Sequence, residues 1–249
     1  HDLTAGPRPT TCLNGDWEWC PVPGAEPGPA PPANARWEQI KVPSLQSPEK
    51  THCAWYRKVF SAPSHVRGER LILKCNQVLS EARFFLNGKS VGYEYQGSQP
   101  FEVDVTAAFK PGETNELLVA VRDWIAYSPV NQERVRRGEA AVFKDGMVAV
   151  AGYPCAMGLG LGGNVWLEGR PAVSVQDVSI VPAVRGRTLS LHYTLRNATG
   201  RAQVVGVKPA LLDAGKPVRT LPRAQTTVPA GATATLTVQH SWPEAKLWW

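Results

Sequence analysis

One tight turn constrains the fold of this chain more than any other feature of its sequence. The dipeptide Asn87-Gly88 lies between two runs of β-prone residues within the segment Ala82–Gly92. Asn and Gly tolerate the positive φ angles of a type I′ turn, so the segment is predicted to form a β-hairpin. Two further strands are predicted, one from the alternating run Gln99–Thr106 and one from a run that ends at Val121. The 22 glycines and 22 prolines favour many turns over long helices.

Alternation of apolar and polar residues continues in the last third of the chain. The composition shifts after Pro171, and alternating runs occur at Val173–Val181, Thr188–Leu195 and Thr233–Val238. Turns rich in Asn, Asp, Pro and Gly separate these runs, which indicates a second β-sandwich. One of the turns, Asn197-Ala198-Thr199, also fits the N-glycosylation sequon.

Two segments are expected to lack regular structure. Residues 1–12 are interpreted as a poorly ordered lead-in that precedes a first strand at Leu13–Trp19. The segment Cys20–Ala35 contains six prolines, and each proline removes a backbone donor. We therefore predict that Cys20–Ala35 is a surface loop, without a helix or a central strand.

Five short motifs occur in an informative order. They are Leu13–Trp17 (LNGDW), Ile40–Pro43 (IKVP), Ala54–Phe60 (AWYRKVF), Gly163–Glu168 (GNVWLE) and Ser241–Trp249 (SWPEAKLWW). Together with the hairpin, they resemble the N-terminal part of glycoside hydrolase family 2, which includes β-galactosidases, β-glucuronidases and β-mannosidases. The resemblance implies an all-β fold with two domains. The first is a jelly-roll, galactose-binding-like β-sandwich at residues 1–170, and the second is an immunoglobulin-like β-sandwich at residues 171–249.

The resemblance covers the non-catalytic part of that family. Its members perform the chemistry in a (β/α)8 barrel of about 250 residues, with two glutamates at the ends of barrel strands. In this chain the available carboxylates lie in no acid/base context, and no Ser/His/Asp arrangement is suggested. We therefore predict no catalytic residues; the carboxylates considered are Glu94, Asp104, Asp123, Glu139 and Asp145.

Sugar binding is the activity that the residues favour. Aromatic rings stack on pyranose faces, while Asp, Asn and Arg hydrogen-bond the hydroxyls. Such residues gather in and beside the long connection that follows Val121, and His52 joins them because the family brings its loop near the substrate pocket. The alternative is that Trp124 and Tyr153 pack the sandwich or dock on a barrel. The substrate-binding candidates are Arg122, Asp123, Trp124, Tyr127, Tyr153 and His52.

The positive charge of the chain includes a short basic run that has two interpretations. The formal net charge is +6, and Arg134, Arg136 and Arg137 form a short basic run. This run favours either an acidic glycan as ligand or a solvated loop. No nucleic-acid-binding motif contains the basic residues, so we expect no nucleic-acid partner. We expect no membrane span either, because the apolar run Met147–Leu161 is too short and too interrupted.

The five cysteines predict neither a cofactor nor a metal site. They form no Cys-x-x-Cys pair, and the glycines before Gly163 are not followed by the Lys-Ser/Thr of a phosphate loop. Cys12 and Cys20 are compatible with a disulfide in an oxidising compartment and equally with free thiols. The chain begins at His1 and not at methionine, which leaves room for a removed upstream segment. The location is left open, with an extracellular or periplasmic one favoured.

Three functions therefore compete at this point. The first is the non-catalytic N-terminal portion of a family 2 glycosidase, which positions substrate and supports a catalytic barrel of the same parent protein. The second is a stand-alone carbohydrate-binding module, and the third is a scaffold without sugar affinity. The ending of the sequence at Trp248-Trp249 favours the first.

Overall fold

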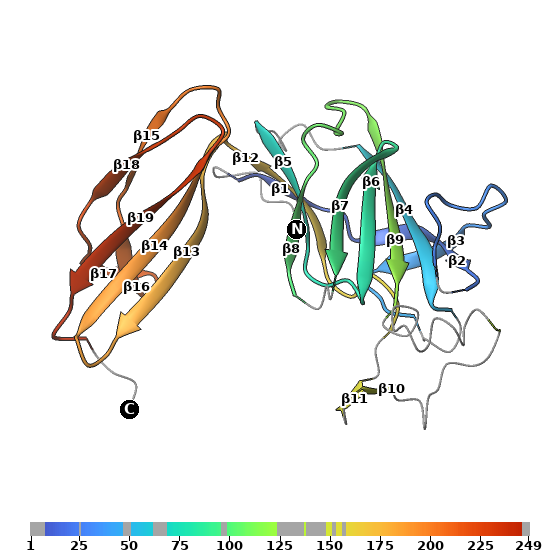
Figure 1. The fold of residues 1–249 in the computed structure, drawn as a ribbon, viewed down its shortest axis with the longest axis horizontal. Coiled ribbons are helices and arrows are strands. Elements are labelled where there is room, and N and C mark those ends of the chain that lie inside the picture. The colour runs from blue at the N-terminus through green and yellow to red at the C-terminus, as the bar shows by residue number, and fades with distance from the viewer. Residues whose placement is uncertain are drawn as a thin grey trace. The chain divides into compact units, whose positions relative to one another are not determined.

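The computed structural model describes residues 8–24, 26–46, 51–61, 69–95, 99–123, 137, 148–150, 153–155 and 158–245. All regular elements in these ranges are β-strands, which confirms the predicted all-β class (Figure 1). None of the described segments is a helix that could cross a membrane. The chain divides into two compact units, His1–Arg170 and Pro171–Trp249, and each unit has its own hydrophobic core.

The first unit contains two large sheets. A six-stranded sheet has the order β3-β2-β4-β9-β6-β7. Its strands are β2 (Gly15–Val22), β3 (Glu38–Val42), β4 (Cys53–Ser61), β6 (Glu81–Leu86), β7 (Lys89–Tyr95) and β9 (Thr114–Arg122). A four-stranded sheet has the order β1-β12-β5-β8. Its strands are β1 (Thr10–Cys12), β5 (Arg70–Cys75), β8 (Phe101–Asp104) and β12 (Val165–Arg170). A short ribbon of β10 (Val148–Val150) and β11 (Tyr153–Cys155) completes the described strands of this unit.

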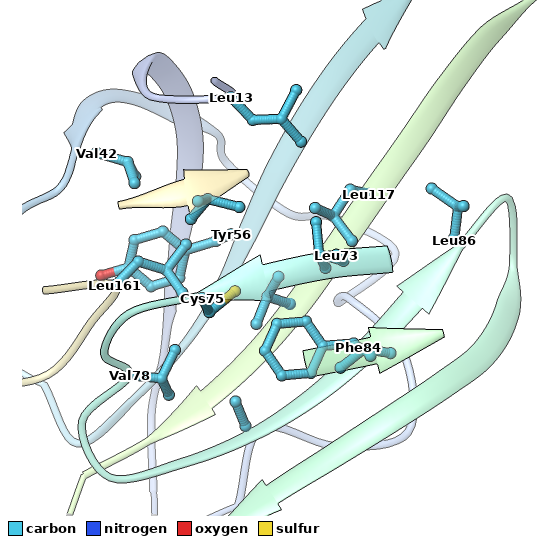
Figure 2. Close-up of a cluster of buried hydrophobic side chains, with 14 of the residues drawn as sticks. Leu13, Val42, Tyr56, Leu73, Cys75, Val78, Phe84, Leu86, Leu117 and Leu161 are labelled. Atoms are coloured by element: carbon cyan, nitrogen blue, oxygen red, sulfur yellow. The ribbon is translucent and has the colours of Figure 1, made fainter. Parts of the chain in front are cut away.

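The main core of the first unit joins residues from both sheets. Successive side chains of a strand point to opposite faces, so alternate residues of each strand enter this core. Tyr56 and Phe84 come from the six-stranded sheet, and Leu73 and Cys75 come from the four-stranded sheet. Figure 2 shows these four side chains gathered together, and each is at most 2% exposed. Burial of these apolar faces against each other is what makes the unit a sandwich.

The predicted hairpin is present as β6 and β7. Its turn residues Asn87 and Gly88 have φ angles of 51° and 77°, in the left-handed region that the type I′ turn requires. The amide of Asn87 donates 2.8 Å hydrogen bonds to the carbonyl oxygen of Ala108 and to Oδ1 of Asn115. The turn is therefore fixed by its own backbone preference and by contacts with the segments around β8 and β9.

Two of the predicted segment boundaries were wrong. Residues 10–12, assigned to a poorly ordered lead-in, form β1 and pair with β12. The first long strand, predicted to stop at Trp19, continues as β2 through Pro21 to Val22. Pro21 is accommodated because β3 pairs with β2 only as far as Trp19, so that β4 alone flanks this end of the strand.

The second unit is also built from antiparallel strands. A three-stranded sheet contains β13 (Val173–Ala183), β14 (Thr188–Asn197) and β19 (Thr233–Ser241). Two strand pairs accompany it: β15 (Gln203–Val207) with β18 (Ala224–Val228), and β16 (Ala210–Asp213) with β17 (Lys216–Thr220). The buried core of this unit contains Leu191, Leu195, Val207, Leu221, Val228 and Val238.

The asparagine of the glycosylation sequon lies inside this second unit. Asn197 is fully buried, and its Nδ2 donates hydrogen bonds to the carbonyl oxygens of Arg201 (2.8 Å), Val228 (3.0 Å) and Pro229 (3.1 Å). Nδ2 is the atom to which a glycan would be attached. In the folded unit this side chain therefore ties together the end of β18 and two loop carbonyls, and its amide is buried.

Candidate functional site

Two polar residues of the first unit, His52 and Asp123, meet at the ends of the neighbouring strands β4 and β9. β4 and β9 are antiparallel, and their register places Cys53 opposite Arg122. The residue before Cys53 is His52 and the residue after Arg122 is Asp123, so these two meet just beyond the sheet. The backbone N–H of Asp123 donates a 3.0 Å hydrogen bond to the carbonyl oxygen of His52, which extends the ladder by one step.

The side chains of His52 and Asp123 form a dyad. Nδ1 of His52 lies 2.9 Å from Oδ2 of Asp123. The carboxylate is completely buried, whereas the imidazole keeps 17% of its surface exposed. The contact between Nδ1 and this buried carboxylate holds the imidazole in one orientation. The dyad thus presents an oriented imidazole to solvent.

A cavity lies against this imidazole. Its volume is about 360 Å³, within the range of small-molecule sites. One wall is the end of β2 with the residues that follow it, and the other wall is the loop that precedes β4. The hydroxyl of Thr51 on this loop donates a 2.9 Å hydrogen bond to the carbonyl oxygen of Cys53, which ties the loop to the strand. The lining residues are Pro21, Val22, Pro23, Gly24, Thr51 and His52.

Arg122 belongs to a different face of the same sheet. Its side chain lies on the outer face, opposite the main core, where its Nε donates a 2.9 Å hydrogen bond to Oε2 of Glu81. A second nitrogen also contacts Glu81, and a third contacts Glu26. Burial alone would lower the pKa of Arg122, but the hydrogen bond and charge of Glu81 raise it overall. The guanidinium is therefore a permanent cation held by two carboxylates.

The outer face around Arg122 is covered by the proline-rich segment. A small apolar cluster of Cys20, Trp55 and Ala120 lies there. Nε1 of Trp55 donates a 2.7 Å hydrogen bond to the carbonyl oxygen of Pro27, and a nitrogen of Arg83 donates a 2.8 Å hydrogen bond to that of Gly28. The predicted surface loop therefore acts as a lid over a second core. The sequence analysis missed this role. The available signal was that Trp55, Arg83 and Arg122 lie on otherwise apolar strands, which indicates that another segment covers this face of the sheet.

Two of the buried cysteines have thiols whose pKa is raised. Burial, with the Asp123 carboxylate, raises the pKa of the Cys53 thiol far above its usual range. Burial also raises the pKa of Cys75 to about 12. Cys20, Cys53 and Cys75 are free thiols, so the possible pairing of Cys12 with Cys20 is not formed. Within the described part of the chain, no group of three or more His, Cys, Asp or Glu side chains is placed to hold a metal ion.

The structure brings together only some of the predicted sugar-binding residues. His52 and Asp123 form the dyad, and Arg122 is adjacent in sequence but committed to Glu81 and Glu26. Trp124 and Tyr127 lie outside the described residues. Tyr153 lies on β11, and only its backbone is described. Their role in binding sugar stays a prediction.

The comparisons with known proteins agree with the fold. Residues 33–149 match the model of the sugar binding domain of glycosyl hydrolases family 2. Over those residues the chain is similar to that sugar binding domain. Among curated relatives, the chain is similar to a β-galactosidase of Thermoanaerobacter pseudethanolicus, with 31% identity over 70 residues that cover 28% of the chain and 9% of the relative. A β-glucuronidase of Formosa agariphila is 27% identical over 141 residues, which cover 49% of the chain and 14% of the relative.

Solved structures extend the likeness to both units. The crystal structure of a putative β-galactosidase from Bacteroides fragilis superimposes with a TM-score of 0.74 and 19% identity. The match covers 98% of this chain and 37% of that protein. The two units therefore share a fold with less than half of that larger protein.

Proposed function

We propose that this chain is the non-catalytic N-terminal portion of a family 2 glycoside hydrolase of the β-galactosidase type. In this proposal residues 1–170 are a jelly-roll, galactose-binding-like domain and residues 171–249 are an immunoglobulin-like domain. Together they position a carbohydrate substrate and support the catalytic barrel of the same parent protein. The observation that carries the proposal is the superposition on a larger putative β-galactosidase over 98% of the chain.

The carboxylates of the first unit suit a structural role better than acid/base chemistry. Glu102 contacts Arg170 through both of its oxygens, at 2.8 and 2.5 Å. Asp104 accepts a 2.7 Å hydrogen bond from Arg70. Glycoside hydrolysis needs two carboxyl groups with different protonation states on either side of one bond. Carboxylates that are each held by a guanidinium stay ionised, so we assign hydrolysis to the parent protein and not to these residues.

The alternative function is a stand-alone carbohydrate-binding module without catalytic activity. The cavity beside His52 favours this alternative, because it offers a site that needs no further domain. In either case carbohydrate is the proposed ligand. Only the first proposal includes hydrolysis of O-glycosidic bonds, and it assigns that hydrolysis to the parent enzyme.

The deciding experiment is the intact mass of the source protein, identified with an antibody against this chain, together with a panel of aryl glycosides. We expect a mass well above 27.1 kDa and hydrolysis of at least one β-glycoside. A mass equal to that of the chain, with no hydrolysis, would refute the parent-enzyme proposal. Glycan titration of the chain would then test the binding-module alternative.

A further inference from the structure

We infer that the second unit carries a binding site for a doubly charged tetrahedral oxyanion, either inorganic phosphate or a phosphate monoester. The site lies on the strand pair of β15 and β18, within the second unit alone, and it requires neither a sugar ring nor a catalytic barrel. Three features support it: two cations that lie side by side, the cavity that they line, and the net charge of the unit.

Lys208 and Arg223 lie side by side at one end of this antiparallel strand pair. β15 ends one residue before Lys208, β18 begins one residue after Arg223, and these two end residues are paired. The two cations are therefore opposite each other, one step beyond the last pair. Past this step, the backbone N–H of Leu221 donates a 3.0 Å hydrogen bond to the carbonyl oxygen of Pro209, which keeps the two segments together. Like charges directly opposite each other are destabilising, so a bound anion would stabilise this arrangement.

The two cations share the outer face of the strand pair with an exposed amide. Val207 packs into the hydrophobic core of the unit, so its neighbours Gly206 and Lys208 lie on the opposite face. Gln225 and Arg223, across the strand pair from them, lie on that face too. A cavity of about 550 Å³ is found here, and its lining residues are Gly206, Val207, Lys208, Arg223, Ala224 and Gln225.

The cavity offers three kinds of hydrogen-bond donor. They are the ammonium of Lys208, the guanidinium of Arg223 and the side-chain amide of Gln225. Gly206 leaves space beside them: the nearest atom that a Cβ at this position would meet is 3.8 Å away, and its φ lies outside the left-handed region. The backbone therefore does not require glycine here, and a side chain would take up part of the cavity. The oxygens of a tetrahedral anion point in several directions and can accept from all three donors.

The charge of the cation pair is matched by a dianion. Among the residues that the structure describes, neither Lys208 nor Arg223 forms an ion pair or a side-chain hydrogen bond. The stretches 205–210 and 221–226 contain no Asp or Glu, and neither do residues 246–249. A phosphate monoester carries about −1.5 to −2 charges at neutral pH, whereas a carboxylate carries about one. Two cations in one cavity therefore favour phosphate.

The second unit as a whole attracts anions. Residues 171–249 contain nine lysines and arginines against three aspartates and glutamates, which accounts for the whole formal net charge of +6. A positive field raises the local concentration of anions and their rate of association. The cation pair thus lies on the part of the chain that an anion approaches most readily.

The test compares two probes of similar shape that differ by one charge. Methyl phosphate is mainly a dianion at about pH 7.5, because its second pKa is about 6, whereas methyl sulfate is a monoanion. Each is titrated into the whole chain at low ionic strength, since salt screens exposed charges, while NMR records the backbone amides of residues 206–208 and 223–225. We expect methyl phosphate to shift these amides and to bind at least about fivefold more tightly than methyl sulfate. Unshifted amides, or equal binding of the two probes, would overturn the inference.

Inorganic phosphate, titrated in parallel, distinguishes the two sources of the anion. Binding within about twofold of methyl phosphate supports a site for the free ion, and weaker binding supports a site for the ester.

Variants separate this site from a general attraction of anions to a basic unit. Arg223→Gln is expected to weaken methyl phosphate binding at least about fivefold. Because it also relieves the repulsion with Lys208, it should leave the unfolding temperature unchanged or raise it. Lys216→Gln is the matched control: it removes one charge from an exposed residue of β17 that does not line the cavity, and it should leave binding within about twofold. Equal weakening by the two variants would refute the site, and Lys208→Gln repeats the test if Arg223→Gln does not fold.

Discussion

The lid formed by the proline-rich segment depends on one buried side chain, Trp55. The indole is 1% exposed, its centroid lies 5.6 Å from that of Phe85, and its N–H donates to the carbonyl oxygen of Pro27. The substitution Trp55→Phe removes the donor and part of the ring but keeps an aromatic side chain. It therefore tests whether the lid is attached through this contact.

The expected loss of stability has two parts. A buried carbonyl oxygen left without its partner costs about 1–3 kcal/mol. The phenyl ring is smaller than the indole by roughly 40 Å³, and at about 24 cal/mol per Å³ an unfilled gap of that size costs about 1 kcal/mol. Together these terms predict a loss of about 2–4 kcal/mol in the first unit, or a fall in its unfolding temperature of about 5–15 °C.

Calorimetry and limited proteolysis measure this effect. The unfolding temperature of the first unit is compared between Trp55→Phe and the control Trp37→Phe. Trp37 is half-buried under the guanidinium of Arg57 at 4.5 Å, a contact worth about 0.5–1 kcal/mol. Cleavage after Glu26 by a glutamate-specific protease should accelerate in Trp55→Phe alone. Equal destabilisation by the two variants, with unchanged cleavage, would refute the role of Trp55 in holding the lid.

Two further predictions concern other polar contacts. The hydrogen bond from Arg170 lowers the pKa of Glu102 from its usual 4.5, in spite of partial burial. Ionised Glu102 therefore stabilises the folded state fully above pH 4.5. This stabilisation is lost as the pH falls through the lowered pKa that Glu102 has in the folded state. Urea unfolding between pH 7 and 3 should show a smaller loss in Glu102→Gln than in the unaltered chain, and solvent screening limits the difference to about 1 kcal/mol or less. The exposed Glu113→Gln is the control, and an identical pH profile for the unaltered chain and Glu102→Gln would contradict the assignment. In the second unit, Asn197→Ala should cost about 2–4 kcal/mol because it removes a buried amide that bonds three carbonyl oxygens, one of them on the buried Val228, whereas Thr199→Val, which also destroys the sequon, should cost less. After expression in a glycosylating host, mass spectrometry should find Asn197 unmodified in the folded protein, and a glycan there would contradict the burial of its amide.

The site illustrates the limit of local reasoning. His52 and Asp123 were both predicted as sugar-binding residues, for different reasons. They are 71 positions apart, and no pattern in the sequence links them. Their contact follows from the register of β4 with β9, which is set by the fit of both strands into the core. The glutamates that hold Arg122 were missed for the same reason.

Local sequence patterns were enough to predict the turn geometry and the all-β class. Asn87-Gly88 specifies its turn because only residues that tolerate positive φ fit there, and alternating residues specify strands because a strand has two faces. The order of the five motifs was sufficient for the family resemblance. Tertiary structure alone decided that the proline-rich segment is a lid, that Asn197 is buried and that an imidazole faces a cavity. These outcomes depend on which distant surfaces pack together, and packing is a property of the whole sandwich and not of any one segment.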